Sequence, residues 1–345
     1  MAIVPNQNKK SRLRMRRTRR AHVLSRQTKI YGMLLLLLLV VSSLVYFKYD
    51  TSPTRSTNVM SSMSSLRGGS SRTIGSDHSQ WVTPDSQPFN ENNEVNNANH
   101  LIMVAGHSVT VSGHLQDAGV DETDWFLLPY QKGKGLPQTI IAHVREGIRQ
   151  AALDPRSILI FSGGETRANT GPVNEGTSYF RVADAMGLWK EGIAKDRNVR
   201  ARAISEEFAT DSFQNLLFSI CRFREITGSY PEKITTVSFS FKQSRFENMH
   251  SKSLLWPPDQ FDYVGIDPDA STGFDIEEAT QGELMNAAMP FESDPYGCHT
   301  EILLEKRRMR NPFHRTPPYE LTCPEMKELL HWCGPDIITS DKVPW

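Results

Sequence analysis

An uninterrupted uncharged segment from Ile30 to Phe47, which contains the six consecutive leucines Leu34–Leu39, constrains this chain most strongly. As a helix rising about 1.5 Å per residue it would be roughly 27 Å long, close to the bilayer core of about 30 Å. A buried core helix is disfavoured because such a run offers water no polar face. A cleavable signal peptide would have a shorter apolar region that ends in small residues, whereas this segment ends in aromatic residues and Lys48. The segment therefore predicts one uncleaved transmembrane helix.

The charges that flank this segment predict its orientation. Ten lysines and arginines lie between Lys9 and Lys29, and the first acidic residue is Asp50, although the whole chain has a net charge of zero. Because basic flanks stay in the cytosol, we expect residues 1–29 to form a cytoplasmic tail and the rest to be luminal. The short span suits the thin Golgi or endoplasmic reticulum membrane. Topology explains the basic tail, so the expected partner is the membrane and no nucleic-acid partner is expected.

The composition changes twice after the anchor. Residues 48–100 are rich in Ser and Asn and poor in aliphatic side chains, so they cannot bury enough apolar surface to offset the entropy of ordering. We expect a flexible stalk there, followed by an α/β domain over residues 101–290. Residues 291–345 are rich in Pro and carry three cysteines, and we expect a C-terminal extension packed on the domain.

Short apolar segments alternate with helical patterns in the predicted domain. The expected strands are Leu101–Ala105, Ser157–Phe161, Ala201–Ser205, Lys233–Phe241 and Phe261–Ile266. The expected helices are Pro137–Leu153, Asn174–Met186, Asp211–Ile226 and Arg245–Leu255, with further helical pieces at Glu301–Arg308 and Pro324–Trp332. Alternation of this kind requires crossover connections, which build a parallel sheet covered on both faces. We predict a doubly wound, mainly parallel, Rossmann-like α/β fold.

The four cysteines allow more than one disulfide. Cys323 and Cys333 are near enough in sequence to close a small loop, with Cys298 as a competing partner. Cys221 sits in an apolar helical pattern and is expected to be a buried thiol. The chain has no CxxC pair, so no structural zinc or other metal site is predicted.

Polar residues follow each predicted strand, and in open parallel sheets ligands bind outside the carboxyl ends of the strands. These residues are His107, Ser162 to Glu165, Glu206, Glu207, Ser240, Lys242, Arg245 and Asp267. Cations, carboxylates and glycine-flanked amides at one edge are suited to a phosphate or a nucleotide. We therefore expect a small anionic ligand.

Each candidate residue has a predicted role. Gly163 and Gly164 would offer backbone amides to an oxyanion, and Lys242 with Arg245 would form a charge clamp at the start of a helix. Asn215 lies inside a helix, where asparagine is mildly unfavourable unless it has a hydrogen-bonding task. The candidate catalytic residues are Glu175, Glu207 and Lys242, and the candidate ligand-binding residues are His107, Gly163, Gly164, Asn215 and Arg245.

A second interpretation starts from Asp267-Pro268-Asp269. A DxD sequence in a Golgi protein with an N-terminal anchor suggests a metal-assisted glycosyltransferase. The same residues also suit an Asp-Pro turn after a strand.

The order of these motifs resembles domain-of-unknown-function family 218, the SanA/YdcF/ElyC-like proteins, over roughly Leu101 to Asp267. The matching segments are Ile158 to Gly164, Asn174-Glu175, Glu207, Thr210 to Asn215 and Val237 to Arg245. Segments similar to the eukaryotic, membrane-anchored branch are Phe241 to Phe246, His250, Trp256-Pro257, Gly265 to Pro268, Asp294 to Gly297 and Arg310 to Phe313.

The resemblance implies a Rossmann-like fold with a polar cleft lined by the Gly pair, the Glu, the Asn and the basic residue after the fourth strand. It also implies envelope, lipid-carrier or glycan metabolism, and S-adenosylmethionine as a cofactor candidate beside a nucleotide. Lys242 stands where many bacterial members have His, and Ser212 where they have Thr.

Three functional hypotheses remain open from the sequence. The first is a domain that binds a phosphorylated or nucleotide-like small molecule, as a hydrolase or transferase. The others are the DxD glycosyltransferase and a non-catalytic, membrane-tethered binding protein. Protein partners are not predicted.

Overall fold

A computed structural model describes residue 95 and residues 97–345. The predicted cytoplasmic tail, membrane anchor and nearly all of the stalk lie outside the described residues. Within the described part, no helix combines the length and the apolar character needed to cross a bilayer.

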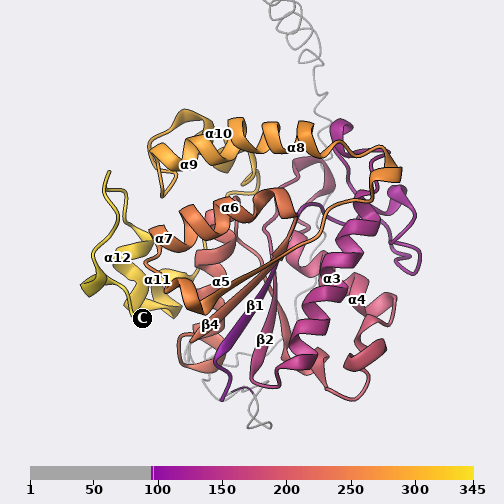
Figure 1. Ribbon diagram of the computed structural model, residues 1–345, viewed down its shortest axis with the longest axis horizontal. Helices are drawn as coiled ribbons and strands as arrows, with labels where there is room; N and C mark the ends of the chain where they lie inside the picture. Colours follow the sequence, from indigo (N-terminus) through magenta and orange to yellow (C-terminus); the bar gives the residue numbers. More distant parts are fainter. Residues whose placement is uncertain (1–94, 96) are drawn as a thin grey trace, which may run out of the picture. The chain divides into compact units, whose positions relative to one another are not determined.

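The central sheet has five parallel strands in the order β3-β2-β1-β4-β5 (Figure 1). The strands are β1 (His100–Ala105), β2 (Ser157–Ser162), β3 (Ala203–Glu206), β4 (Lys233–Ser238) and β5 (Phe261–Gly265). In the centre of the sheet, Met103 of β1 pairs with Ile160 of β2 and Thr236 of β4. β1 and β2 are buried along their whole lengths, as expected for strands that are covered on both faces. The predicted parallel, Rossmann-like α/β sheet is confirmed.

Helices cover both faces of the sheet because strand side chains alternate between the faces. Ile102 and Val104 of β1 pack in one core with α3 (Leu136–Leu153) and α4 (Glu175–Ala185). Leu101 and Met103 pack in the other core, with α5 (Ser212–Thr227). The single strand β1 therefore contributes to two hydrophobic cores.

Local sequence signals explain where the main helices begin and end. The Asn174 side chain accepts a 2.6 Å hydrogen bond from the Thr177 amide at the start of α4. Asp211 does the same for Gln214 at the start of α5, at 2.9 Å. Side-chain caps of this kind satisfy amides that have no partner inside the helix. Gly228, with a φ of 78°, ends α5 in the left-handed conformation that glycine adopts without strain.

The fourth strand is shorter than predicted. It ends at Ser238, and residues Ser240–Lys242 form a 3-10 turn instead of continuing to Phe241. The Ser240 amide donates to the Asp267 carboxylate at 2.9 Å and so leaves the sheet ladder. A Cβ atom on Gly265 would lie 2.6 Å from the Ser240 Cα, so glycine permits this close approach. The third strand also starts later than predicted, because residues Val199–Arg202 form a 3-10 turn.

A helical layer lies across one end of the sheet (Figure 1), and the sequence analysis predicted only its last helix, as Glu301–Arg308. It consists of α8 (Ile276–Glu283), a π-helical turn (Leu284–Ala288), α9 (Met289–Ser293) and α10 (Glu301–Met309). Below it, α6 (Gln243–Arg245), a second π-helical turn (Phe246–His250) and α7 (Ser251–Ser253) follow β4. Asp275 caps α8 by accepting from the amides of Glu277 and Glu278. This cap and the acidic first turn were the available sequence signals.

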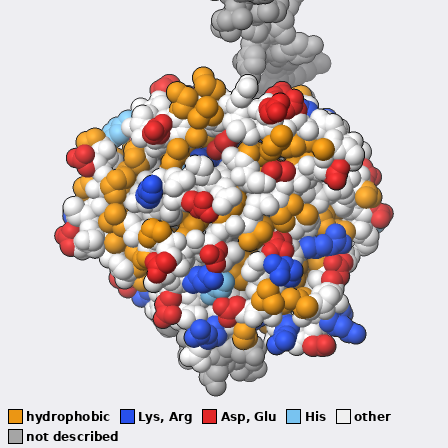
Figure 2. Space-filling view, in the orientation of Figure 1, with side chains coloured by type: hydrophobic (Ala, Val, Ile, Leu, Met, Phe, Trp, Pro, Cys, Tyr) orange, Lys and Arg blue, Asp and Glu red, His pale blue; other side chains and the backbone are white. Residues whose placement is uncertain are grey.

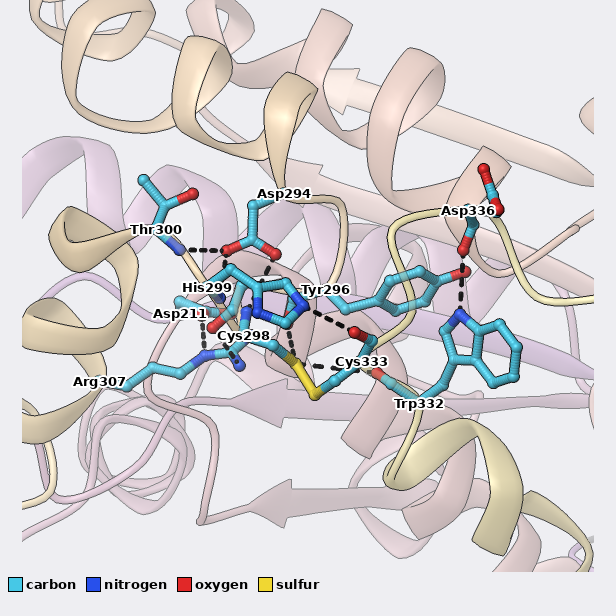
Figure 3. Close-up of a disulfide and its surroundings, with 11 residues drawn as sticks. Asp211, Asp294, Tyr296, Cys298, His299, Thr300, Arg307, Trp332, Cys333 and Asp336 are labelled. Carbon is cyan, nitrogen blue, oxygen red and sulfur yellow. Dashed lines mark hydrogen bonds and ion pairs between the residues drawn. A yellow bond between two sulfur atoms is a disulfide. The ribbon is translucent and has the colours of Figure 1, made fainter.

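The C-terminal segment is joined covalently and by hydrogen bonds around Cys298 (Figure 3). Cys298 forms a disulfide with Cys333, across a sequence separation of 35 residues. The structure thus selects Cys298 over Cys323, which is a buried free thiol because Cys323 lies inside the core against α5. Cys221 is also a buried free thiol, as predicted. The short helices α11 (Tyr319–Thr322) and α12 (Lys327–Leu330) place Tyr319 and Leu329 in the core shared with α5.

Candidate functional site

A cavity of about 660 Å³ lies at the carboxyl ends of β1 and β4. The strand order reverses between these two strands, and such a switch point is where open α/β sheets bind ligands. The cavity is lined by α8 on one side and by residues at the ends of β1 and β4 on the other, namely Gly106, His107, Ser238, Phe239, Phe241, Lys242, Arg245 and Phe246. Its volume falls within the range of roughly 300–1,000 Å³ typical of small-molecule sites. We call it the edge cavity.

His107 joins the ends of the two central strands. Its Nε2 lies 3.3 Å from the Ser238 hydroxyl, and its Nδ1 lies 3.5 Å from the Lys242 ammonium nitrogen. Burial, and then the charge of Lys242, lower the pKa of His107 well below its ordinary value. A neutral His107 that accepts from Lys242 at Nδ1 carries its proton on Nε2 and donates it to Ser238. His107 therefore holds Lys242 in place.

Lys242 is partly buried and lies over two aromatic rings. Its Nζ is 4.9 Å from the centroid of Phe239 and 5.8 Å from that of Phe241. Burial, and then the neighbouring Arg245 guanidinium, lower the pKa of Lys242 to about 7. A lysine with this pKa exchanges its proton near neutral pH, so it can act as a general acid or base. Lysine stands here where many bacterial members of family 218 have histidine, and it still allows acid–base chemistry at this position.

Positive charge exceeds negative charge in the edge cavity. Apart from Lys134, which pairs with Glu278 at 3.0 Å, the lining cations are Arg167, Lys242, Arg245, Lys306 and Arg310. The acids that face them are Glu175 and Glu283; the other lining acids are Asp211, paired with Arg307, and Asp275, which caps α8.

The cations affect each other's protonation. Burial, Arg310 and Arg245 together lower the pKa of Lys306 to about 8. Burial lowers the pKa of Arg310 below its ordinary value. Arg167 has a buried Nε atom with no hydrogen-bond partner. Since like charges disfavour each other's charged forms, each of these cations makes it harder for its neighbours to hold a positive charge.

Glu175 is the first residue of α4 and lies against two glycines. Its carboxylate accepts a 2.5 Å hydrogen bond from Thr166 and lies 3.9 Å from the Arg167 guanidinium. A Cβ atom on Gly106 or Gly163 would come within 2.6 or 2.7 Å of the Glu175 Cβ. These two glycines therefore allow the helix start and the strand ends to approach each other.

The predicted role of Gly163 and Gly164 as amide donors to an anion is wrong. The Gly163 amide donates to the Glu206 carbonyl at 3.0 Å, and the Gly164 amide to the Ala209 carbonyl at 2.8 Å. Neither glycine lines the edge cavity. Both amides are already used by the backbone of the neighbouring strand and loop, so the pair serves packing.

Glu207 lies outside the edge cavity, so its predicted catalytic role has no structural support. Its carboxylate accepts from the hydroxyls of Ser205 and Thr177, at 2.7 and 2.9 Å. The adjacent Glu206 is fully buried, accepts from Ser162 and Tyr319, and has its pKa raised to about 7 by burial. Both acids therefore have structural partners at the β3 end.

The remaining predicted residues do line the edge cavity. Asn215 donates from Nδ2 to the carbonyl and the hydroxyl of Ser162, both at 2.9 Å, and so connects α5 to the end of β2. Arg245 forms a buried ion pair with Glu283 of α8, at 3.1 Å. The structure thus brings together His107, Glu175, Asn215, Lys242 and Arg245.

Several cavity residues were not predicted as site residues. Arg167 lies on the loop before α4, whereas Lys306 and Arg310 come from the end of α10. None of them follows a strand, so the strand-end rule could not find them. The only sequence signal for any of these residues was that Arg310 belongs to a segment that resembles the eukaryotic branch of family 218.

The residues of the DxD sequence have turn-forming roles. Asp267 accepts from the amide and the hydroxyl of Ser240, and Asp269 accepts from the Ser271 amide at 2.8 Å. Neither aspartate lines the edge cavity. Among the described residues, no group of three or more His, Cys, Asp or Glu side chains is arranged to hold a metal ion. The Asp-Pro turn is therefore the interpretation that matches this geometry.

Comparisons with known proteins identify one family relationship. No protein-family model matches the chain, and no solved structure matches it. A Saccharomyces cerevisiae protein, described as the uncharacterized protein YOR238W, is 31% identical over 232 residues, which cover 56% of this chain and 76% of the yeast protein. This chain therefore belongs to the same protein family as yeast YOR238W.

Proposed function

We propose that the edge cavity binds a phosphorylated or nucleotide-like small molecule. The observation that carries this proposal is the excess of cations over facing carboxylates among the residues that line the cavity. Burial, and then the neighbouring arginines, lower the pKa values of Lys242 and Lys306. A phosphate dianion would relieve the repulsion among these groups and accept charge-assisted hydrogen bonds from them. The order of motifs, which resembles that of family 218, also supports the proposal of a polar ligand at this edge.

The distribution of charge favours a small ligand over nucleic acid. The face in Figure 2 carries acidic and basic side chains intermixed, without a broad basic surface. Nucleic-acid binding relies on many phosphate contacts along an extended surface. The excess charge instead lies inside a cavity of small-molecule size.

We further propose that Lys242 and Glu175 would carry a hydrolase or transferase reaction on this ligand. Near neutral pH, Lys242 can give a proton to the leaving ester oxygen, or take one from the attacking water or hydroxyl group. Glu175, held by Thr166, would orient a hydroxyl group or a water molecule. Arg167, Arg245 and Arg310 would hold the phosphate oxygens, a task suited to guanidinium groups.

A thermal-shift measurement on the full chain in detergent tests ligand binding. Inorganic phosphate, nucleotides, sugar nucleotides, polyprenyl phosphates and S-adenosylmethionine are compared for wild type, Lys242→Ala and Lys252→Ala. Lys252 is the matched control, because it is exposed and does not line the edge cavity. We expect a phosphorylated compound to raise the melting temperature of wild type and Lys252→Ala, and to raise it much less for Lys242→Ala. An equal rise in all three proteins, or no rise with any anion, contradicts the proposal.

We also propose that this domain lies in the lumen of the Golgi or endoplasmic reticulum, tethered by the predicted anchor as a single-pass type II protein. The Cys298–Cys333 disulfide supports this address, because disulfides persist in oxidising compartments. The chain has no native Asn-x-Ser/Thr acceptor. Asn92→Thr creates one at Asn90, and we expect this variant to gain a glycan that endoglycosidase removes. An unmodified product in a glycosylating host contradicts luminal placement.

A further inference from the structure

Aromatic rings form a row along one wall of the edge cavity. His107 stacks on Phe239 with ring centroids 4.4 Å apart, and Phe239 stacks on Phe241 at 5.0 Å. Phe274, on the loop before α8, continues the row at 6.1 Å from Phe241. The planes of neighbouring rings differ by 18° to 29° along the row. The wall is therefore a nearly parallel stack of rings that runs from the carboxyl ends of β1 and β4 to the loop before α8.

Packing in the hydrophobic core explains the positions of Phe239 and Phe241 in this wall, but it does not explain that of Phe274. Phe239 is buried in the core shared with α3 and α4, and Phe241 packs against that core. Phe274 is only partly buried, belongs to neither hydrophobic core, and lines the edge cavity. A phenylalanine exposed inside a charged cavity leaves apolar surface in water, which is unfavourable by about 25 cal/mol per Å². A ligand that covers this ring would recover that loss.

The aromatic wall lies directly beside the cations. The Lys242 ammonium nitrogen is 4.9 Å from the Phe239 centroid and 5.8 Å from the Phe241 centroid. A phosphate bound to Lys242 therefore places the adjoining part of its ligand along Phe241 and Phe274. Aromatic rings prefer partners that are themselves flat and offset-stacked, with centroids about 4.5–7 Å apart.

We infer that the ligand is a nucleoside phosphate, whose base stacks on Phe274 at the outer end of the aromatic row while its phosphate binds the cavity cations. This inference rests on the proposed anion site and specifies the other half of its ligand. A sugar phosphate would supply the anion but would leave the rings uncovered. A prenyl phosphate would cover them without the planar contact that a stack of this geometry selects.

Titration calorimetry of the full chain in detergent separates these ligands. AMP, GMP, CMP and UMP are each compared with ribose 5-phosphate, which has the same phosphate and sugar but no base, and with farnesyl phosphate. Stacking of a base on aromatic side chains contributes about 1–3 kcal/mol, so we expect at least one nucleotide to bind roughly 5- to 100-fold more tightly than ribose 5-phosphate. Phe274→Leu keeps an apolar side chain without the ring and should reduce this preference, whereas Phe274→Tyr should retain it. Inorganic phosphate should bind all three proteins equally.

The outcomes distinguish this inference from the proposed function. The inference is overturned if ribose 5-phosphate binds wild type as tightly as every nucleotide, or if farnesyl phosphate binds more tightly than all of them. An unchanged preference in Phe274→Leu also overturns it. The wild-type comparison needs no variant and stands even if Phe274→Leu does not fold. If neither inorganic phosphate nor any phosphate ester binds wild type, the proposed anion site itself is wrong.

Discussion

Two hollows on the surface of this domain are rich in basic residues, yet their charges are arranged differently. The second hollow, of about 260 Å³, is lined by Phe208, Thr210, Gln214, Phe218, Arg307, Arg308, Asn311, His314, Arg315 and Pro317. Each of its arginines pairs with a carboxylate: Arg307 with Asp211, Arg308 with Glu305 and Arg315 with Glu165. In the edge cavity the cations outnumber the facing acids, and two lysines have lowered pKa values.

The two hollows therefore differ in how far their charges are compensated rather than in whether they contain basic residues, and we propose that this difference decides which of them binds an anion. Figure 3 shows Arg307 directed at Asp211, close to the disulfide. Burial alone would raise the pKa of Asp211, but Arg307 lowers it, and the same carboxylate caps α5 by accepting from the Gln214 amide. The charge of Asp211 therefore has a structural role. Substituting an arginine of the second hollow should therefore lower stability or have no effect. Substituting an arginine of the edge cavity should weaken anion binding.

The largest effect is expected from Arg307→Met. This change removes the 2.6 Å partner of Asp211, whose side chain is 2% exposed. Breaking a buried pair by removing one partner costs about 3–5 kcal/mol, because the other charge stays buried without compensation. Urea unfolding of the variant and wild type measures the difference. A loss below about 1 kcal/mol would mean that pairing does not distinguish the second hollow from the edge cavity.

Arg310→Met should weaken phosphate binding and leave the free energy of unfolding nearly unchanged, whereas Arg307→Met should mainly lower stability. Arg310 donates to the Thr210 carbonyl at 3.2 Å, forms no ion pair with a carboxylate in the described part of the chain, and lowers the pKa values of Lys242 and Lys306. Removing it should change the free energy of unfolding by less than about 1 kcal/mol, because lost packing is offset by relieved repulsion. Hydrogen bonds to charged groups contribute about 1.5–3 kcal/mol, so phosphate affinity should fall roughly 10- to 100-fold. Calorimetric titration with phosphate measures the affinity, and urea unfolding measures the free energy of unfolding. If the phosphate affinity of Arg310→Met is unchanged, the anion does not bind beside Arg310.

Phosphate affinity should also depend on pH through Lys242. Its pKa is lowered to about 7, so in the free protein it loses its proton as the pH rises above 7. An anion binds the protonated form, and binding must then take up a proton, so affinity should fall by up to about 10-fold per pH unit above 7. Below about pH 6 a phosphate monoester loses its second charge, so binding should be tightest between roughly pH 6 and 7.

Lys242→Arg is the control for this pH dependence, because a guanidinium stays protonated. Calorimetry at several pH values should show affinity falling from about pH 7 in wild type but only from about pH 8 in Lys242→Arg, where Lys306 still loses its proton. The same fall in both proteins would assign the titration to another group.

The smallest effect is expected from Arg308→Ala. Arg308 is exposed and pairs with Glu305 on the same helix, where such pairs contribute at most about 0.5 kcal/mol. Its removal should change neither unfolding nor phosphate affinity measurably, by the same urea and calorimetric assays. A clear loss of affinity would make the second hollow an anion site and remove the distinction between the two.

The strand ends were predictable because short apolar segments and the parallel-sheet rule depend on local sequence. His107, Glu175 and Lys242 all follow or face a strand end and do line the edge cavity. Gly163 and Gly164 also follow a strand, yet a neighbouring segment takes their amides, which no local pattern reveals. The layer from Ile276 to Ser293 was missed because its apolar side chains are sparse, and Leu284, Met285 and Met289 are exposed.

The sequence by itself determined the parallel α/β sheet and the edge at which polar residues gather, because both follow from short-range patterns of burial and polarity. It also predicts the membrane anchor, through an apolar run that needs no tertiary partner. Only the tertiary structure decided which cysteines pair and which cations stay uncompensated, because Arg307 and Arg310 lie three residues apart in sequence but meet different partners. Charge compensation depends on distances between segments far apart in the chain, so the uncompensated cations of the edge cavity became visible only in the folded protein.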